Sequence, residues 1–260
     1  MRSSNVRLGR RPAVHDPRVP RFAAISAGLP PPPPESCWYA DIPVWRMLAN
    51  DRAGCCVQAM ILHSIMQQDA YLHSGAGLIA TDEEALALYS AMTGYSPDDS
   101  NTDNGTFVMG PKGAMQYWHD HGVMAGGRLN KLTACATIDP RNMLHLRQSV
   151  DVFGGVGIGI DFPVQLLSHP VVPFVWDDIS GPREGHEVLV VGYETIGSLV
   201  MYDVVSWGEI FRIPEGALLM ILEEAVGIYD RASLDARGVN AAGMSEAVLL
   251  ADMAALRAQA

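Results

Sequence analysis

DRAGCCVQAM, residues 51–60, places two adjacent cysteines directly after a glycine, where a polar loop changes into an apolar helix. From this point apolar residues recur near helical spacing, at Val57, Met60, Ile61, Ile65 and Leu72. The spacing predicts a long helix that begins around Cys56 and stops near Gly75. A thiol at a helix N-terminus lies beside unsatisfied amides and the positive end of the helix dipole, which favour the thiolate. Cys56 is therefore a candidate nucleophile.

A nucleophilic cysteine also needs a base and hydrogen-bond donors for the oxyanion. His186 stands at the start of the apolar strand EVLVVGYE, and Asn50 lies six residues before Cys56 with a side-chain amide that can donate. Taken singly, each residue has a plainer explanation, because a buried cysteine is often a small hydrophobe and a buried histidine a core residue. A disulfide between Cys55 and Cys56 would be strained.

The two halves of the chain have different periodicities. The first half predicts two further helices, one with a capping box at Thr81 and Glu84 that stops near Gly94, and one from Pro111 to Gly122. The second half holds β-rich runs at residues 152–162, 187–194, 198–207 and 209–213, with a hairpin turn at 194–198. These patterns predict an α+β fold in which the long helix packs against an antiparallel sheet, with a cleft between the halves.

The ends of the chain are predicted to be appendages of one domain at residues 36–214. Residues 1–35 form a basic arm and a proline-rich strap, LPPPPPE, which must be extended. Residues 215–260 are predicted as a C-terminal helical appendage, with helices at 215–231 and 245–258. The first 21 residues carry net charge +5 and the rest −16. The arm could therefore contact an acidic partner or nucleic acid, or equally lie on its own acidic domain.

Several classes of protein are disfavoured by composition. Without a run of 18 apolar residues, no membrane span is expected. The acidic body argues against nucleic-acid binding, and the four cysteines, whose spacing is not that of a disulfide framework or a zinc site, argue for a reducing compartment. The first 21 residues are too polar for an ordinary signal peptide, so secretion is not expected. The loop Asp99, Asn101, Asp103 lacks the glycine and glutamate of a calcium loop, and His119 and His121 point to different helix faces, so no metal is expected. Gly154–Gly159, GGVGIG, lies in a β run and is not a dinucleotide motif, so no cofactor is expected.

The order of these parts resembles the papain-like cysteine peptidases over about residues 45–213. Asn50, Gly54 and Cys56 have the spacing of the family's nucleophile motif, although the family has glutamine at the first position. GHEVLVVGY at 185–193 is similar to the strand that carries the family's histidine, and VSWG at 205–208 to its N-S-W-G. DNGTFVMG, from Asp103 to Gly110, resembles the stretch that borders the substrate pocket.

The resemblance implies a role for each matched residue. Cys56 is the nucleophile, His186 its ion-pair partner and general acid, and the Asn50 side chain with the Cys56 amide the oxyanion donors. Cys55 fills a position that requires a small residue, and Trp207 shields the imidazole from water. Substrate contacts are expected at Gly54, Gly105, Phe107 and Trp207. The implied substrate is a peptide or protein.

The pattern departs from the family at Val205, which replaces the asparagine that orients the histidine. A valine side chain neither donates nor accepts a hydrogen bond. Asp203 lies two residues earlier on the same strand face and is the first choice of substitute, with Ser206 as the alternative.

A narrower resemblance links LGRRPA, MLANDRAGCC and VVSWG to papain-like proteins encoded in tailed-phage and prophage genomes. It implies a product of the host cytoplasm or the virion. The sequence therefore predicts a cysteine hydrolase, most simply a peptidase. The alternative is a non-catalytic or residually active virion protein with the same fold, which its N-terminal arm attaches to phage structural proteins.

Overall fold

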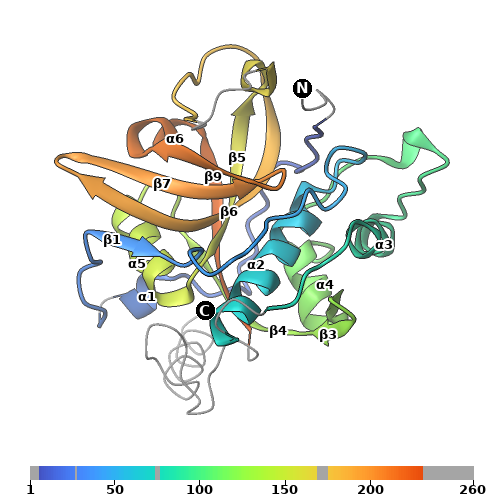
Figure 1. Cartoon of the computed structure of the whole chain (residues 1–260), viewed down its shortest axis with the longest axis horizontal. Coiled ribbons are helices and arrows are strands. Elements are labelled where there is room, and N and C mark those ends of the chain that lie inside the picture. The colour runs from blue at the N-terminus through green and yellow to red at the C-terminus, as the bar shows by residue number, and fades with distance from the viewer. Residues whose placement is uncertain (1–5, 27, 74–76, 169–174, 231–260) are drawn as a thin grey trace.

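The computed structural model describes residues 6–26, 28–73, 77–168 and 175–230. Figure 1 shows helices α2 (Cys56–Leu72), α3 (Asp82–Thr93) and α4 (Ala114–His121) on one side of the molecule and a curved sheet on the other. The strand order in the sheet is β4-β9-β5-β6-β7-β8, with β1 paired to β6, and all these pairs are antiparallel. The predicted α+β arrangement of a helical half against an antiparallel sheet is confirmed.

The remaining elements complete the two halves. The strands of the large sheet are β1 (Glu35–Cys37), β4 (Leu132–Ile138), β5 (Val156–Pro163), β6 (Arg183–Ile196), β7 (Leu199–Ser206), β8 (Glu209–Pro214) and β9 (Leu222–Asp230). A small hairpin joins β2 (Val123–Ala125) and β3 (Arg128–Asn130). The other helices are α1 (Ala23–Ser26), α5 (Met143–Phe153) and α6 (Glu215–Ile221), with short 3₁₀ turns at Ser100–Thr102 and Val164–Ser168.

Helix α2 runs through the middle of the molecule. Apart from a few residues near its C-terminal end, its side chains are buried, polar ones included. These polar groups find partners: the His63 ring nitrogen Nε2 lies 2.8 Å from the Arg46 carbonyl oxygen, and Gln58 donates to the Thr106 hydroxyl. Because buried polar groups are costly unless they are hydrogen-bonded, these contacts fix the helix between the two halves.

Local signals set the ends of the predicted helices. Helix α3 has the predicted capping box between Thr81 and Glu84 and ends at Gly94, whose φ of 78° suits glycine. Helix α4 ends at Gly122 as predicted, but its N-cap is Gly113. Pro111 therefore lies in the preceding turn and not in the first helical turn.

The predicted C-terminal helical appendage is wrong for residues 215–230. Only the short α6 is helical, and β9 follows it directly, paired on both sides with β4 and β5 in the interior of the sheet. The β-branched and aromatic residues Val226, Ile228 and Tyr229 are buried there, so sheet pairing overrides the helical pattern of the sequence. The domain thus extends past its predicted boundary at residue 214. The predicted helix at 245–258 lies outside the described residues.

The described part of the arm and strap packs onto the domain. Strand β1 pairs with β6, and the Thr195 amide donates to the Pro34 carbonyl. Phe22 is fully buried against the rings of His145 and Phe153. The sequence left open whether the basic arm contacts another molecule or its own acidic domain. In the structure, the described part of the arm contacts its own domain.

Phe22→Ala is expected to lower the free energy of unfolding by about 3 kcal/mol, since it removes a fully buried aromatic side chain from the core. Arg21→Ala, at the exposed neighbouring position, is the matched control and should have little effect. Urea denaturation of both full-length variants measures the difference. Equal stabilities would mean that the arm does not contribute to the core.

Two further features concern the described residues only. None of their helices combines the length and hydropathy needed to cross a bilayer. None of the four cysteines forms a disulfide, and this includes the adjacent Cys55 and Cys56.

Candidate active site

Cys56 is the first residue of α2 and is 1% exposed. Burial raises the pKa of its thiol to about 12, although hydrogen bonds from the backbone amides of Glu187 and Gly9 act in the opposite direction. The helix N-terminus alone therefore does not produce a thiolate in this structure. The thiol is neutral because the protein surrounds its sulfur and excludes water, which disfavours the charged form.

His186 lies on β6 and is fully buried. Its Nε2 lies 2.7 Å from the Ser206 hydroxyl oxygen, and its Nδ1 has no hydrogen-bond partner among the described residues. The indole of Trp207 stacks on the imidazole, with ring centroids 4.5 Å apart and planes 15° apart. Burial, aided by the positive charge of Arg10, lowers the pKa of His186 to about 3. The imidazole is thus neutral, oriented by Ser206 and covered by the Trp207 indole.

Ser206, and not Asp203, is the residue that contacts the histidine. The Asp203 carboxylate accepts hydrogen bonds from the Tyr39 hydroxyl at 3.0 Å and from Arg212 at 2.8 Å. The prediction of Asp203 as the orienting group is therefore wrong. Val205 is 1% exposed and belongs to the apolar cluster around α2, whereas the next residue, Ser206, points to the opposite face of the strand, where it meets His186.

Asn50 and Cys55 lie in the loop before α2. The Asn50 side-chain amide donates to the Ala53 carbonyl at 3.1 Å, which uses one of its two amide hydrogens. Cys55 is fully buried, and its sulfur lies 3.4 Å from the Leu48 carbonyl oxygen. Burial raises the pKa of Cys55 further than that of Cys56, so its environment is that of a packing residue.

Comparison with known proteins rests on the structure, since no protein-family model and no curated protein matches the sequence. Xylellain, a cysteine protease from Xylella fastidiosa, superposes with a TM-score of 0.64 over 88% of this chain and 97% of its own, at 15% identity. Digestive procathepsin L 3 of the Tenebrio molitor larval midgut has a TM-score of 0.60 at 17% identity, over 86% of this chain and 76% of its own. Procathepsin B S9 from Trypanosoma congolense has a TM-score of 0.61 at 12% identity, over 87% of each chain. The chain has the papain-like fold.

Within this papain-like fold, two residues that the sequence did not identify hold the loop in front of Cys56. The Asp103 carboxylate accepts hydrogen bonds from the Gly54 amide at 3.0 Å and from the Tyr89 hydroxyl at 2.7 Å. The Tyr89 hydroxyl in turn accepts from the Gly105 amide at 2.8 Å. Asp103 and Tyr89 thereby tie the nucleophile loop to the predicted substrate-binding segment. The sequence placed Asp103 at the start of the stretch that resembles the border of the substrate pocket, but it did not indicate this contact.

The space between the two halves of the papain-like fold is filled by residues 7–11, called the arm segment below. The Arg7 amide donates to the Asn50 carbonyl, and the Trp207 indole donates to the Arg7 carbonyl. Further along, the Arg10 amide donates to the Gly185 carbonyl at 3.1 Å. The Thr106 amide donates to the Gly9 carbonyl and the Arg11 amide to the Thr106 carbonyl, both at 2.9 Å. The arm segment is therefore bound as an extended peptide by the residues that flank Cys56 and His186.

Glycines allow this close approach. A Cβ atom on Gly9 would lie 1.9 Å from the Gly54 carbonyl oxygen, and one on Gly185 would lie 2.3 Å from the Arg10 carbonyl oxygen. Phe107, another predicted substrate contact, lies beneath the Arg11 guanidinium at 4.3 Å from the ring centroid. The predicted substrate-binding residues Gly54, Phe107 and Trp207 thus all contact the arm segment, and a Cβ on Gly105 would lie 2.3 Å from the Gly9 carbonyl oxygen.

Among the described residues, no cluster of three His, Cys, Asp or Glu side chains could hold a metal ion.

Proposed function

We propose that the protein is a cysteine hydrolase acting on peptide amide bonds, with Cys56 as nucleophile and His186 as base, and that the arm segment keeps it latent. One observation carries the proposal. The arm segment, an extended peptide held in a groove by backbone hydrogen bonds, contacts both Cys56, through the Gly9 amide, and Gly185, the residue next to His186, through the Arg10 amide. A groove of this kind binds main chain, and the chemistry beside it suits an acyl transfer.

The reaction follows from the roles of the groups. Nδ1 of His186 takes the proton of Cys56, and the thiolate attacks the substrate carbonyl carbon to form a C–S bond. The Asn50 side-chain amide and the Cys56 amide stabilise the oxyanion. The C–N bond then breaks as the imidazolium protonates the leaving amine. Water, deprotonated by the imidazole, hydrolyses the thioester and regenerates the thiol.

Latency follows from what the arm segment presents to the sulfur. Gly9 offers its amide N–H to Cys56, so a donor and not a carbonyl carbon faces the nucleophile. The segment also excludes water, which keeps the thiol and the imidazole neutral. Displacement of the segment would admit both solvent and substrate.

The test is to locate the acyl intermediate in the full-length Gly9→Val variant, whose added side chain would overlap the Gly54 carbonyl and lift the arm segment. The protein is mixed with the p-nitrophenyl ester of an N-acetylated amino acid, quenched in acid and mapped by peptide mass spectrometry. The acyl group is expected on the side-chain sulfur of Cys56. Cys55→Ser is the matched control, and its Cys56 should still be acylated. Acylation that survives Cys56→Ser would overturn the assignment.

A second candidate, a non-catalytic module with this fold, is favoured by the neutral, fully buried state of Cys56. On this view the groove is kept for its shape. Absence of acylation in every variant that frees the groove would favour it. Attachment to phage structural proteins and a location in the host cytoplasm or the virion remain predictions of the sequence alone.

A further inference from the structure

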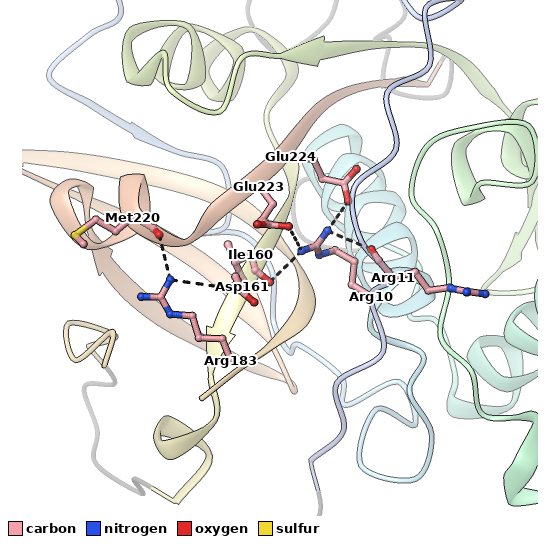
Figure 2. A network of polar contacts seen from close by, with 8 residues as sticks. All are labelled: Arg10, Arg11, Ile160, Asp161, Arg183, Met220, Glu223 and Glu224. Atoms are coloured by element: carbon pink, nitrogen blue, oxygen red, sulfur yellow. Dashed lines mark hydrogen bonds and ion pairs between the residues drawn. The ribbon is translucent and has the colours of Figure 1, made fainter. Parts of the chain in front are cut away.

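The side chain of Arg10 enters a pocket of its own beside the catalytic pair. The residue is 6% exposed as a whole, and its backbone is fixed between Gly185 and Thr106. Figure 2 shows its guanidinium directed at Glu223 and Glu224, at the start of β9, while the side chain of Arg11 points the other way. One residue of the arm segment thus points into the protein and the next points out, as in any extended peptide.

The contacts in this pocket match a guanidinium. Arg10 Nη1 donates to Glu224 Oε1 at 2.9 Å, and Nη2 donates to Glu223 Oε2 at 3.3 Å and to the Ile160 carbonyl at 3.5 Å (Figure 2). The Arg10 side chain is 2% exposed and that of Glu224 12% exposed. Two carboxylates and a carbonyl at these positions use the fork of donors that distinguishes arginine from lysine.

A third acid, Glu187, follows the catalytic histidine in sequence and is 2% exposed. Neither of its carboxyl oxygens has a hydrogen-bond partner among the described residues. It pairs in register with Gly159 on β5, and Gly159 pairs on its other side with Glu224 on β9. Its carboxyl group interacts electrostatically with Arg10 and Glu224, which places it at the same pocket, and burial raises its pKa above the ordinary value. A buried acid without a partner is costly unless a cation balances it.

The floor of the pocket requires a glycine. A Cβ atom on Gly159 would lie 2.7 Å from both Arg10 Cδ and Glu224 Cγ. The aliphatic part of the Arg10 side chain lies where a side chain on residue 159 would otherwise be. Shape and charge therefore select a long side chain that ends in a cation.

We infer that this pocket, formed by Glu187, Glu223, Glu224 and Gly159, is a specificity subsite for an arginine side chain of the peptide substrate, and that Arg10 occupies it in the latent protein. The inference rests on the proposed function for the identity of its ligand as a substrate. The pocket itself does not depend on catalysis, because a peptide bound in the groove would place one side chain where Arg10 now lies.

The test uses full-length Gly9→Val/Arg10→Ala, in which the arm segment is lifted and the pocket is empty. Isothermal titration compares N-acetyl-arginine amide with N-acetyl-citrulline amide, which has nearly the same shape without the charge. We expect the arginine compound to bind at least about tenfold more tightly, as an ion pair in a partly buried site should. Adding Glu224→Gln should abolish the difference, and Glu83→Gln, on the exposed surface of α3, should leave it unchanged.

A second measurement separates this inference from the proposed function. Fluorogenic peptides that differ only by arginine or citrulline at one position are offered to the Gly9→Val/Arg10→Ala variant. Selective binding without hydrolysis of either would support the pocket and contradict the hydrolase. Hydrolysis with no preference for arginine, or equal binding of the two amides, would overturn the pocket.

Should the double variant fail to fold, the single change Glu224→Gln in the otherwise native chain tests the same contact. It removes one ion pair of Arg10 and should accelerate alkylation of Cys56 at pH 7, whereas Glu83→Gln should not. Equal labelling rates would contradict a role of the pocket in holding Arg10.

Discussion

Replacing Gly9 by valine is expected to raise the rate at which iodoacetamide alkylates Cys56 at pH 7 by up to about 1,000-fold. In the native protein burial raises the pKa of this thiol from 9.0 to about 12, so the reactive thiolate is very rare. A Cβ on residue 9 would lie 1.9 Å from the Gly54 carbonyl oxygen, so the arm segment cannot keep its place. Return of solvent removes the effect of burial, and a thiol pKa that falls from about 12 to 9.0 gives a roughly thousandfold larger thiolate fraction at pH 7.

The matched control is Gly28→Val, because a Cβ at Gly28 meets no atom within 4 Å. Its labelling rate should equal that of the native protein. An independent pair of variants tests the same segment by charge. Arg10→Glu adds a fourth acid to the pocket that Glu187, Glu223 and Glu224 line and should also release the segment, whereas Arg11→Glu changes an exposed side chain. Peptide mapping distinguishes Cys56 from Cys55. Slow labelling in both Gly9→Val and Arg10→Glu, with the fold retained, would contradict latency.

The pH profile of labelling adds a second signature. In the native protein the pKa of His186 is lowered to about 3 by burial and by the charge of Arg10, so the imidazole is neutral at pH 7 and no ion pair forms. Release of the arm segment removes both causes and raises this pKa. Labelling of Gly9→Val should therefore persist below pH 7, where a thiolate paired with an imidazolium survives. The variant Gly9→Val/His186→Ala should lose the low-pH labelling and react only as the ordinary thiol titrates.

The parts of the site that the sequence predicted are those that local pattern determines. Apolar spacing located the start of α2, and hence Cys56, within a residue. The strand that carries His186 and the hairpin of residues 187–207 were likewise readable, because apolar patterning and turn residues act over a few positions. The structure stacks Trp207 on His186, with ring centroids 4.5 Å apart.

The parts that the sequence did not predict depend on pairing between distant segments. Whether position 203 or 206 faces His186 is decided by the register of β6 against β7, which shifts between Val190 and Gly192. The arm segment reaches Gly185 across more than 170 positions, and nothing local to its arginines specifies that contact. The pocket acids come from two strands, one of which has a helical sequence pattern, so their meeting could not be anticipated.

Ser206→Ala is expected to lower kcat/KM of the Gly9→Val protein by about 10- to 100-fold. The Ser206 hydroxyl lies 2.7 Å from Nε2 of His186 and fixes the ring, which on the proposed function leaves Nδ1 to take the proton of Cys56. A hydrogen bond to a charged group contributes about 1.5–3 kcal/mol, and this one strengthens when the imidazolium forms. Hydrolysis of a fluorogenic peptide and low-pH alkylation should both fall, since each needs the oriented ring.

Asp203→Ala is the matched control on the same strand. It removes the partner of Tyr39 and Arg212, so it should lower the urea midpoint while kcat/KM of the folded protein stays unchanged. The opposite ranking, with activity lost in Asp203→Ala and retained in Ser206→Ala, would contradict the observed register. Ser206→Thr, which keeps the hydroxyl, should retain most of the activity and separates loss of the hydrogen bond from loss of packing.

Val205→Asn tests whether an asparagine at the position that the family motif implies can support His186 in this structure. The resemblance to the papain-like peptidases implies an asparagine at 205, so restoring it would rescue Ser206→Ala if position alone mattered. In this structure Val205 is 1% exposed and packs in the apolar cluster around α2, on the face of the strand away from His186. An asparagine there would bury an amide without a partner at a cost of about 1–3 kcal/mol and leave the imidazole unsupported. We therefore expect lower stability without recovered activity. Recovery of activity would contradict the observed register, because the new amide could reach His186 only if position 205 faced the histidine. The sequence alone had implied that position 205 does so.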